Sequence, residues 1–358
     1  MKPIVALLVF ILGAPLPLTA QWLTQPTSGI PRTADGKPDL SAEGPRTADG
    51  RPDLSGLWLM RTPLAYLGNI VSDLKAADVQ PWAGLLYQQR LEDLGRGEPG
   101  AACLPIGPRH IIGIGLAKII QSPNLLVVLY EDLSYRQIFL DGRDLPKNPN
   151  PSWMGYSVGH WEGDALLVES LGFNDRTWLD AFGHPHTEAL RITERFRRLD
   201  LGHMSIQVTI DDAKAYMKSW SVDVAMNLAA DTELLEYVCA ESNSDGRHPV
   251  GRTPNETRVK VASDILAKYI GDYVISPPNA ALPVSLFTVT LVGDQLFIDF
   301  DGKGHFPLIP LSETAFSLGG SFEFVVNDRS VVTTLIWHTV ERDQKAVRTS
   351  ESTPARPR

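Results

Sequence analysis

This chain of 358 residues has fewer positively charged than negatively charged side chains. Its 33 Lys and Arg residues are outnumbered by 42 Asp and Glu residues, which leaves a formal net charge of −9. A general nucleic-acid binder carries a basic patch or stripe that neutralises phosphates, so the composition predicts no nucleic-acid partner. Long apolar runs are also lacking beyond the first residues, and we expect no integral membrane segment once those residues are removed.

Motifs that hold cofactors or activate nucleophiles are absent as well. The sequence contains no phosphate-binding glycine loop, no dinucleotide-binding fingerprint and no Gly-x-Ser-x-Gly elbow, so no cofactor is predicted. Ser72 precedes Lys75 by three residues, which is the nucleophile spacing of serine β-lactamases. No Lys-Thr-Gly partner follows, so this hydrolase class is disfavoured.

The first residues have the pattern of a secretory signal peptide. Lys2 is followed by an apolar run from Ile4 to Leu12, and the small residue Ala20 provides a cleavage point. The run is shorter than the roughly 20 residues that span a bilayer. We therefore predict a signal peptide over residues 1–20 and a periplasmic or secreted protein.

Cysteine is scarce, with Cys103 and Cys239 as the two examples in the sequence. In an exported chain an even pair is most simply interpreted as one disulfide. It would close a loop of 239 − 103 = 136 residues. Two separate buried thiols are the alternative.

Residues 21–55 are poor in large apolar side chains and contain a near-identical duplication. The segment Pro31–Ser41 returns as Pro45–Ser55, with a single difference between the copies. Because the second copy runs directly into Gly56–Trp58, which is typical of a first barrel strand, we expect that copy to dock on the fold. The first copy is predicted to belong to a flexible, loosely held lead-in.

Apolar residues recur at helical intervals between Asp73 and Leu94, which predicts one short helical region. Elsewhere, short runs rich in β-branched and aromatic residues alternate with turn residues, as in sandwiches and barrels. We therefore predict a mainly β protein with two lipocalin-like antiparallel β-barrel or sandwich domains. Their predicted bounds are 56–241 and 263–348, with a polar linker over 242–262 and a disordered tail over 349–358.

Long blocks of the first predicted domain resemble a family of secreted bacterial proteins of unknown function. Among these blocks are Pro52–Trp58, Met154–Glu169 and Gly172–Asp180. The resemblance covers residues 44–241 and implies membership of a family but no activity. His160 departs from the pattern, because we would expect Arg at that position.

The C-terminal part is similar to a small lipocalin-like domain that often follows β-lactamase-related serine hydrolase domains. The similarity rests on Leu266–Tyr273, Gln295–Ile298 and Phe306–Glu313. It implies an accessory domain, and it implies nothing about catalysis.

Ionisable and aromatic side chains concentrate between Arg136 and Arg195, where strands are expected. Alternate residues of a strand share a face, so Arg136 should lie on one face with Ile138, and inside a barrel it would need a carboxylate partner. Aromatic residues beside convergent polar groups are typical of a small-molecule pocket, and they are equally typical of a barrel core. The residues that we expect to bind a ligand are Arg136, Asp141, Arg143, Trp161, Glu169, Asn174, Trp178 and Arg195.

Two histidines and a carboxylate are spaced two residues apart at His184, His186 and Glu188. They could meet a metal ion with help from His160 or Asp180, or they could perform acid–base chemistry without a metal. We assign no metal from this pattern. The candidate catalytic residues are His184, His186, Glu188, Asp180, His160 and Glu162.

Three hypotheses follow for the function. The preferred one is an exported lipocalin-like protein that binds a small, partly apolar molecule near residues 136–195. The second is a hydrolase, isomerase or hydratase that uses a histidine and a carboxylate at the same barrel, with a small-molecule substrate. The third is a structural protein of the cell envelope. An enzyme requires a His and a carboxylate within hydrogen-bond reach in an open cleft, whereas a binding protein requires the cavity alone.

Overall fold

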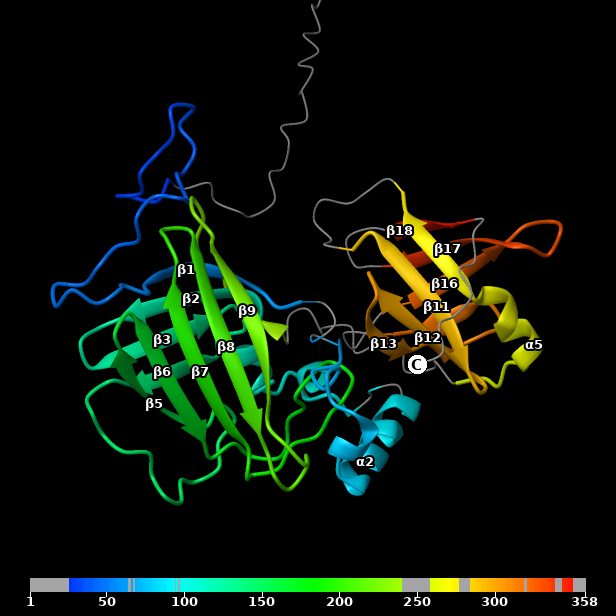
Figure 1. Cartoon of the computed structure of the whole chain (residues 1–358), viewed down its shortest axis with the longest axis horizontal. Helices are drawn as coiled ribbons and strands as arrows, with labels where there is room; N and C mark the ends of the chain where they lie inside the picture. Colours follow the sequence, from blue (N-terminus) through cyan, green and yellow to red (C-terminus); the bar gives the residue numbers. More distant parts are fainter. Residues whose placement is uncertain are drawn as a thin grey trace, which may run out of the picture.

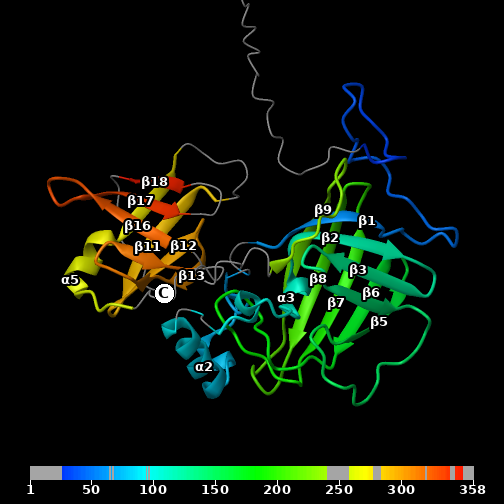
Figure 2. The same ribbon diagram turned by 180° about the vertical axis from the view of Figure 1, so that it is seen from behind.

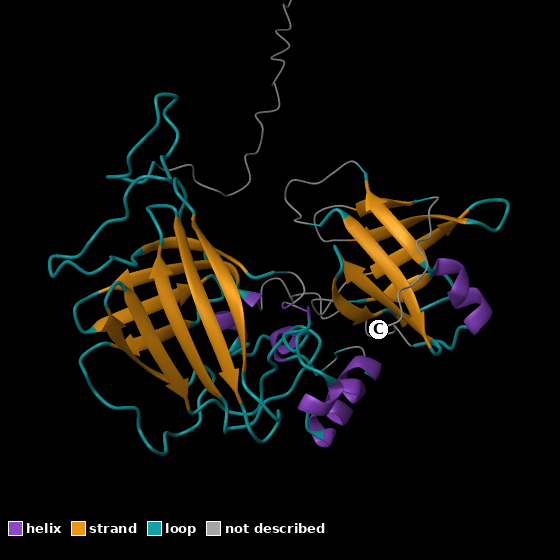
Figure 3. Ribbon diagram, in the orientation of Figure 1, coloured by secondary structure: helices purple, strands orange, loops and turns teal. Residues whose placement is uncertain are grey.

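A computed structural model of the chain describes residues 26–63, 66, 68–93, 95, 97–239, 258–276, 284–318, 321–338 and 343–349. The predicted signal peptide, most of the predicted linker and all but the first residue of the predicted tail lie outside these ranges. The described chain is mainly β, with two separate sheets and few helices (Figures 1 and 3). The predicted fold class is therefore confirmed.

The first domain is a closed barrel in which nine strands follow the order of the chain. Strand β1 pairs with β9 and closes the sheet. Neighbouring strands are antiparallel except for β4 and β5, which run parallel because residues 140–155 cross from one end of the barrel to the other. The strands are β1 (Gly56–Arg61), β2 (Ile114–Gln121), β3 (Leu125–Tyr130), β4 (Tyr135–Phe139), β5 (Tyr156–Glu162), β6 (Ala165–Leu171), β7 (Arg191–Arg198), β8 (His203–Asp211) and β9 (Trp220–Leu228).

The barrel interior is filled by the side chains of alternate strand residues. In β8 every second residue from Met204 to Ile210 is buried, while the residues between them are more exposed. The same period of two in β9 buries Trp220 and Met226. A strand whose side chains alternate between apolar and polar turns its apolar face to the interior, and this pattern gives the barrel its core.

The second domain is a nine-stranded antiparallel sheet in the order β13-β12-β11-β10-β18-β17-β16-β15-β14. Its core is rich in aromatic residues, and Phe287, Phe316 and Phe322 are fully buried there. Phe182 of the first domain packs against this core and contacts Phe306, with 5.6 Å between the ring centroids. The strands are β10 (Gly271–Ile275), β11 (Leu286–Val292), β12 (Gln295–Phe300), β13 (Lys303–Pro307), β14 (Ile309–Pro310), β15 (Ala315–Ser317), β16 (Ser321–Val326), β17 (Val332–His338) and β18 (Asp343–Arg348).

The helices are short and lie outside the two sheets, as the two opposite views show (Figures 1 and 2). The predicted helical region contains a 3-10 turn, η1 (Ala76–Asp78), and the helix α2 (Pro81–Glu92). Proline at the first position of α2 fits a helix start, because its missing N–H would be unpaired there in any case. The others are η2 (Pro99–Ala102), α3 (Arg109–Ile112), α5 (Ser263–Leu266) and η3 (Ala267–Tyr269). Within the described part of the chain, no helix combines the length and apolar character needed to cross a membrane.

The two copies of the duplicated segment adopt the same turn, and both lie against the first barrel. Arg32 donates to the Gly36 carbonyl and forms a bidentate ion pair with Asp231, at 2.9 and 2.6 Å. Arg46 donates to the Gly50 carbonyl in the same way and pairs with Asp164, at 3.0 and 2.8 Å. The first copy therefore contacts the barrel through Arg32, as the second copy does through Arg46.

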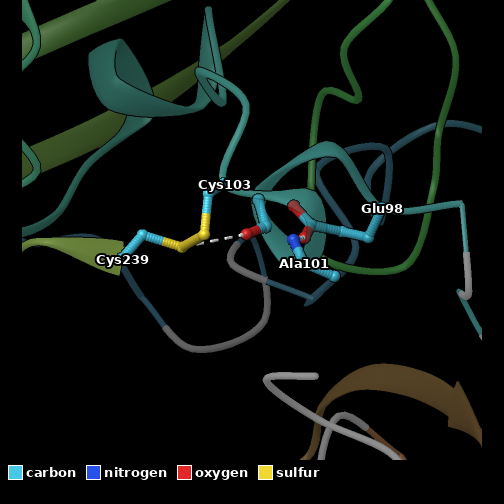
Figure 4. The surroundings of a disulfide bond; sticks show 5 residues. Glu98, Ala101, Cys103 and Cys239 are labelled. Atoms are coloured by element: carbon cyan, nitrogen blue, oxygen red, sulfur yellow. Dashed lines mark hydrogen bonds between the residues drawn. A yellow bond between two sulfur atoms is a disulfide. The ribbon is translucent and has the colours of Figure 1, made fainter. Parts of the chain in front are cut away.

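Cys103 and Cys239 form the disulfide that the sequence suggested, with 5.6 Å between their Cα atoms. Cys103 ends η2 in the connection between β1 and β2, and Cys239 follows the last strand, so the bond joins that connection to the segment after β9 (Figure 4).

Candidate functional site

Arg136 and Glu194 form an ion pair inside the first barrel. The Arg136 guanidinium donates to both carboxylate oxygens of Glu194, and it also donates to Ser157 at 3.1 Å and to Ser170 at 2.7 Å. Burial alone lowers the pKa of Arg136, but the Glu194 carboxylate outweighs it and the pKa is raised. These four side chains bond one another, so the Arg136 guanidinium is engaged within the barrel interior.

His184 and Asp180 lie together in a loop that packs beneath helix α2. His184 Nδ1 is 2.5 Å from Asp180 Oδ2, and the imidazole stacks on Tyr87 with 3.8 Å between ring centroids. Asp180 also accepts the backbone N–H groups of Phe182, Gly183 and His184. Burial alone raises the pKa of Asp180, but His184 and the backbone donors outweigh it, so the pKa is lowered. Both side chains are buried, and their bonds hold the loop in shape.

His186 points to other partners. Its Nδ1 is 3.2 Å from the Thr187 carbonyl oxygen and must donate, so its Nε2 accepts from the Thr177 hydroxyl at 2.6 Å. Burial lowers the pKa of His186, which keeps the ring neutral. Glu188, the third member of the pattern, is exposed. In the ranges that the structure describes, no group of three or more His, Cys, Asp or Glu side chains is placed to hold a metal ion.

The remaining predicted residues lie at separate places on the first domain. His160 and Arg195 both face Glu162 on the outer surface, at 3.5 and 2.6 Å. Trp178 is buried beneath the guanidinium of Arg90, 4.9 Å from the ring centroid. The others form an exposed Asp141–Arg143 pair, an exposed Glu169, a half-buried Trp161 and a half-buried Asn174 that caps the Arg176 N–H. The residues between 136 and 195 therefore do not converge on one site.

A cavity lies elsewhere on the first domain, at the end of the barrel where β2 begins and β3 ends. We call it the mouth pocket. It encloses about 600 Å³ and is lined by residues of three segments: 98–110, 130–134 and 237–239, with Leu116 between them. Its volume lies in the range of small-molecule sites, which are roughly 300–1,000 Å³.

The apolar wall of the mouth pocket includes two exposed leucines. Leu104 and Leu133 have exposed fractions of 48% and 59%, and Pro105, Ile106 and Leu116 complete the wall. Exposed apolar side chains gathered in a concave surface are typical of a ligand site.

A polar cluster lines the same pocket. His110 Nε2 is 3.0 Å from Asp132 Oδ2 and 3.1 Å from the Ser134 hydroxyl, which itself donates to Asp132 Oδ1 at 2.6 Å. Partial burial alone would raise the pKa of Asp132, but His110 and Ser134 lower it to about 2. The imidazole stacks on Tyr130, with 4.2 Å between the centroids. Since Nε2 faces an ionised carboxylate, it carries the proton and donates to Asp132.

The disulfide forms one side of the mouth pocket. Both cysteines line the cavity, and Cys239 Sγ lies 3.7 Å from the Gly100 carbonyl oxygen (Figure 4). Glu98 caps η2 by accepting the Ala101 N–H at 2.7 Å, and it also pairs with Arg109. The Tyr237 N–H donates to the Glu131 carbonyl, which ties the segment after β9 across the pocket. The disulfide therefore joins two of the three segments that line the mouth pocket, 98–110 and 237–239.

No residue of the mouth pocket other than the two cysteines was singled out by the sequence analysis. A signal was available, because a Cys103–Cys239 bond brings the segment after β9 next to the segment before β2. Combined with barrel closure, that constraint would have pointed to this end of the barrel.

No model of a known protein family matches this chain, and no curated protein sequence is significantly similar to it.

Proposed function

We propose that the first domain binds a small, partly apolar molecule in the mouth pocket. The observation that carries the proposal is a cavity of about 600 Å³ whose lining combines exposed leucines with the His110–Asp132–Ser134 cluster. The leucines would cover an apolar body, while the polar cluster would orient a polar end. The second domain would act as an accessory that packs against the first through Phe182.

A neutral fluorescent probe, N-phenyl-1-naphthylamine, tests this proposal directly. Saturable binding of one probe per chain is expected, and Leu104→Asp should weaken it at least tenfold by placing a charge in the apolar wall. The matched control is Leu85→Asp, because Leu85 is an exposed leucine of α2 that does not line the mouth pocket. Absence of saturable binding, or equal loss in both variants, would remove the proposal and favour a structural role.

A catalytic role is the second candidate, and one contact favours it: a His and a carboxylate within hydrogen-bond reach in an open pocket. Against it, a carboxyl with a pKa of about 2 is a weak base at neutral pH. Hydrolysis of p-nitrophenyl butyrate by the purified protein, lost in both His110→Gln and Ser134→Ala, would support the enzyme. Turnover no faster than the buffer blank would leave the binding function.

We also infer that the protein works in an oxidising compartment outside the cytoplasm. The support is the Cys103–Cys239 disulfide together with the signal-like first residues. Thiol labelling of the protein from fractionated cells should find both cysteines oxidised in the exported fraction. Reduced cysteines on protein retained in the cytoplasm would contradict the inference.

A further inference from the structure

We infer that the ligand of the mouth pocket is an organic cation, an apolar body that carries an amino group. This inference rests on the proposed binding function and adds the class of ligand. It comes from the balance of charges in the cavity wall, which carries Glu98, Glu131 and Asp132 against a single arginine, Arg109.

The arginine is already neutralised. Arg109 pairs with Glu98, and both side chains are largely buried by this contact, with exposed fractions of 17% and 20%. An anionic ligand would have to break that pair to reach the guanidinium. The pocket therefore offers little to a carboxylate or a phosphate.

Glu131 and Asp132 are the other two carboxylates of the lining. In the described part of the chain, neither Glu131 nor Asp132 forms an ion pair with a lysine or arginine; Glu131 accepts the Leu116 N–H at 3.2 Å, and Asp132 is bonded by His110 and Ser134. The pKa of about 2 keeps Asp132 ionised across the physiological range. Once Glu98 and Arg109 are set against each other, Glu131 and Asp132 leave the lining with more carboxylates than arginines.

A metal ion does not fit this arrangement. Among the residues that the structure describes, no three acidic, histidine or cysteine side chains come together to ligate one. The carboxylates instead stand beside the leucine wall, so a charge at one end and an apolar body at the other would satisfy both. A protonated amine on a hydrocarbon or aromatic skeleton has this form.

Three probes of matched shape test the inference: 4-phenylbutylamine, 4-phenyl-1-butanol and 4-phenylbutyrate, titrated against the full chain by ligand-detected NMR. We expect the amine to bind about fivefold to tenfold more tightly than the alcohol, and the acid to bind most weakly, because two partly exposed carboxylates attract a cation through screening solvent. Raising the salt concentration should reduce the preference for the amine.

Two variants test whether the carboxylates of Glu131 and Asp132 cause the preference for the amine. Glu131→Gln and Asp132→Asn should each reduce the preference for the amine about threefold and leave the alcohol affinity unchanged. Glu131→Gln keeps an acceptor for the Leu116 N–H, so it remains informative if Asp132→Asn disturbs the fold. Glu169→Gln is the control, because Glu169 is an exposed carboxylate on the outer face of β6.

The outcomes separate this inference from the proposed function. If none of the three probes binds, the binding function fails together with the inference. If the alcohol or the acid binds as tightly as the amine, or if Glu169→Gln lowers the preference as much as Glu131→Gln, the pocket remains a binding site but the cationic ligand is overturned.

Discussion

Removing one member of the buried Arg136–Glu194 pair should destabilise the first barrel by several kcal/mol. The exposed fractions of the two side chains are 3% and 1%, so Glu194→Gln leaves the Arg136 charge buried without an opposite charge. Losing one partner of such a pair costs about 3–5 kcal/mol. Because glutamine still accepts a hydrogen bond from the guanidinium, we expect the lower end of that range, about 3 kcal/mol.

Urea unfolding at pH 7, followed by tryptophan fluorescence, measures this change, because Trp58 and Trp220 are buried in the barrel and report its unfolding. The control is Arg195→Gln. Arg195 is the next residue along β7, but its side chain points outward to the exposed Glu162. Its replacement should leave the midpoint unchanged within error.

The double variant Arg136→Met/Glu194→Leu separates charge from packing. It removes both charges and keeps apolar volume, so its free energy of unfolding should lie within about 1 kcal/mol of the wild type. The two single losses should therefore not add. A Glu194→Gln loss below about 1 kcal/mol, or additive losses in the double variant, would refute the reasoning.

Three further perturbations test other parts of the structure. Burial lowers the pKa of His186, so the stability that the neutral ring contributes is complete above its unfolded pKa near 6.5 and declines as the pH falls below that value. In urea unfolding, His186→Gln should reduce this decline by at most about 1.4 kcal/mol per pH unit. An unchanged slope of stability against pH would contradict the lowered pKa of His186. Replacing Cys103 and Cys239 by serine should lower the melting temperature, because loop entropy alone is worth up to about 4–5 kcal/mol, and an unaltered Tm would argue against the bond. Gly202→Ala would place a methyl group 2.8 Å from the Leu40 carbonyl oxygen and should expose the first repeat to limited proteolysis, whereas equal resistance would mean that this repeat is held elsewhere.

The positions of the charged residues show what strand periodicity can predict and what it cannot. Strand periodicity put Arg136 on one face with Ile138 and called for a carboxylate partner if that face was the interior. The structure supplies Glu194 as that partner, from a strand 58 residues away. Periodicity alone does not say which of two polar faces turns inward, so His160, Glu162 and Arg195 gave the same signal although they lie outside.

The sequence by itself determined the β architecture and the short helical region, and it favoured one disulfide over two separate thiols, because alternation, turn residues and an even cysteine count are local or compositional signals. The mouth pocket was decided by the tertiary structure. Segments 98–110, 130–134 and 237–239 meet because β1 pairs with β9 and the disulfide joins the β1–β2 connection to the segment after β9. Contacts between such distant segments depend on closure of the whole sheet, which no short stretch of sequence encodes.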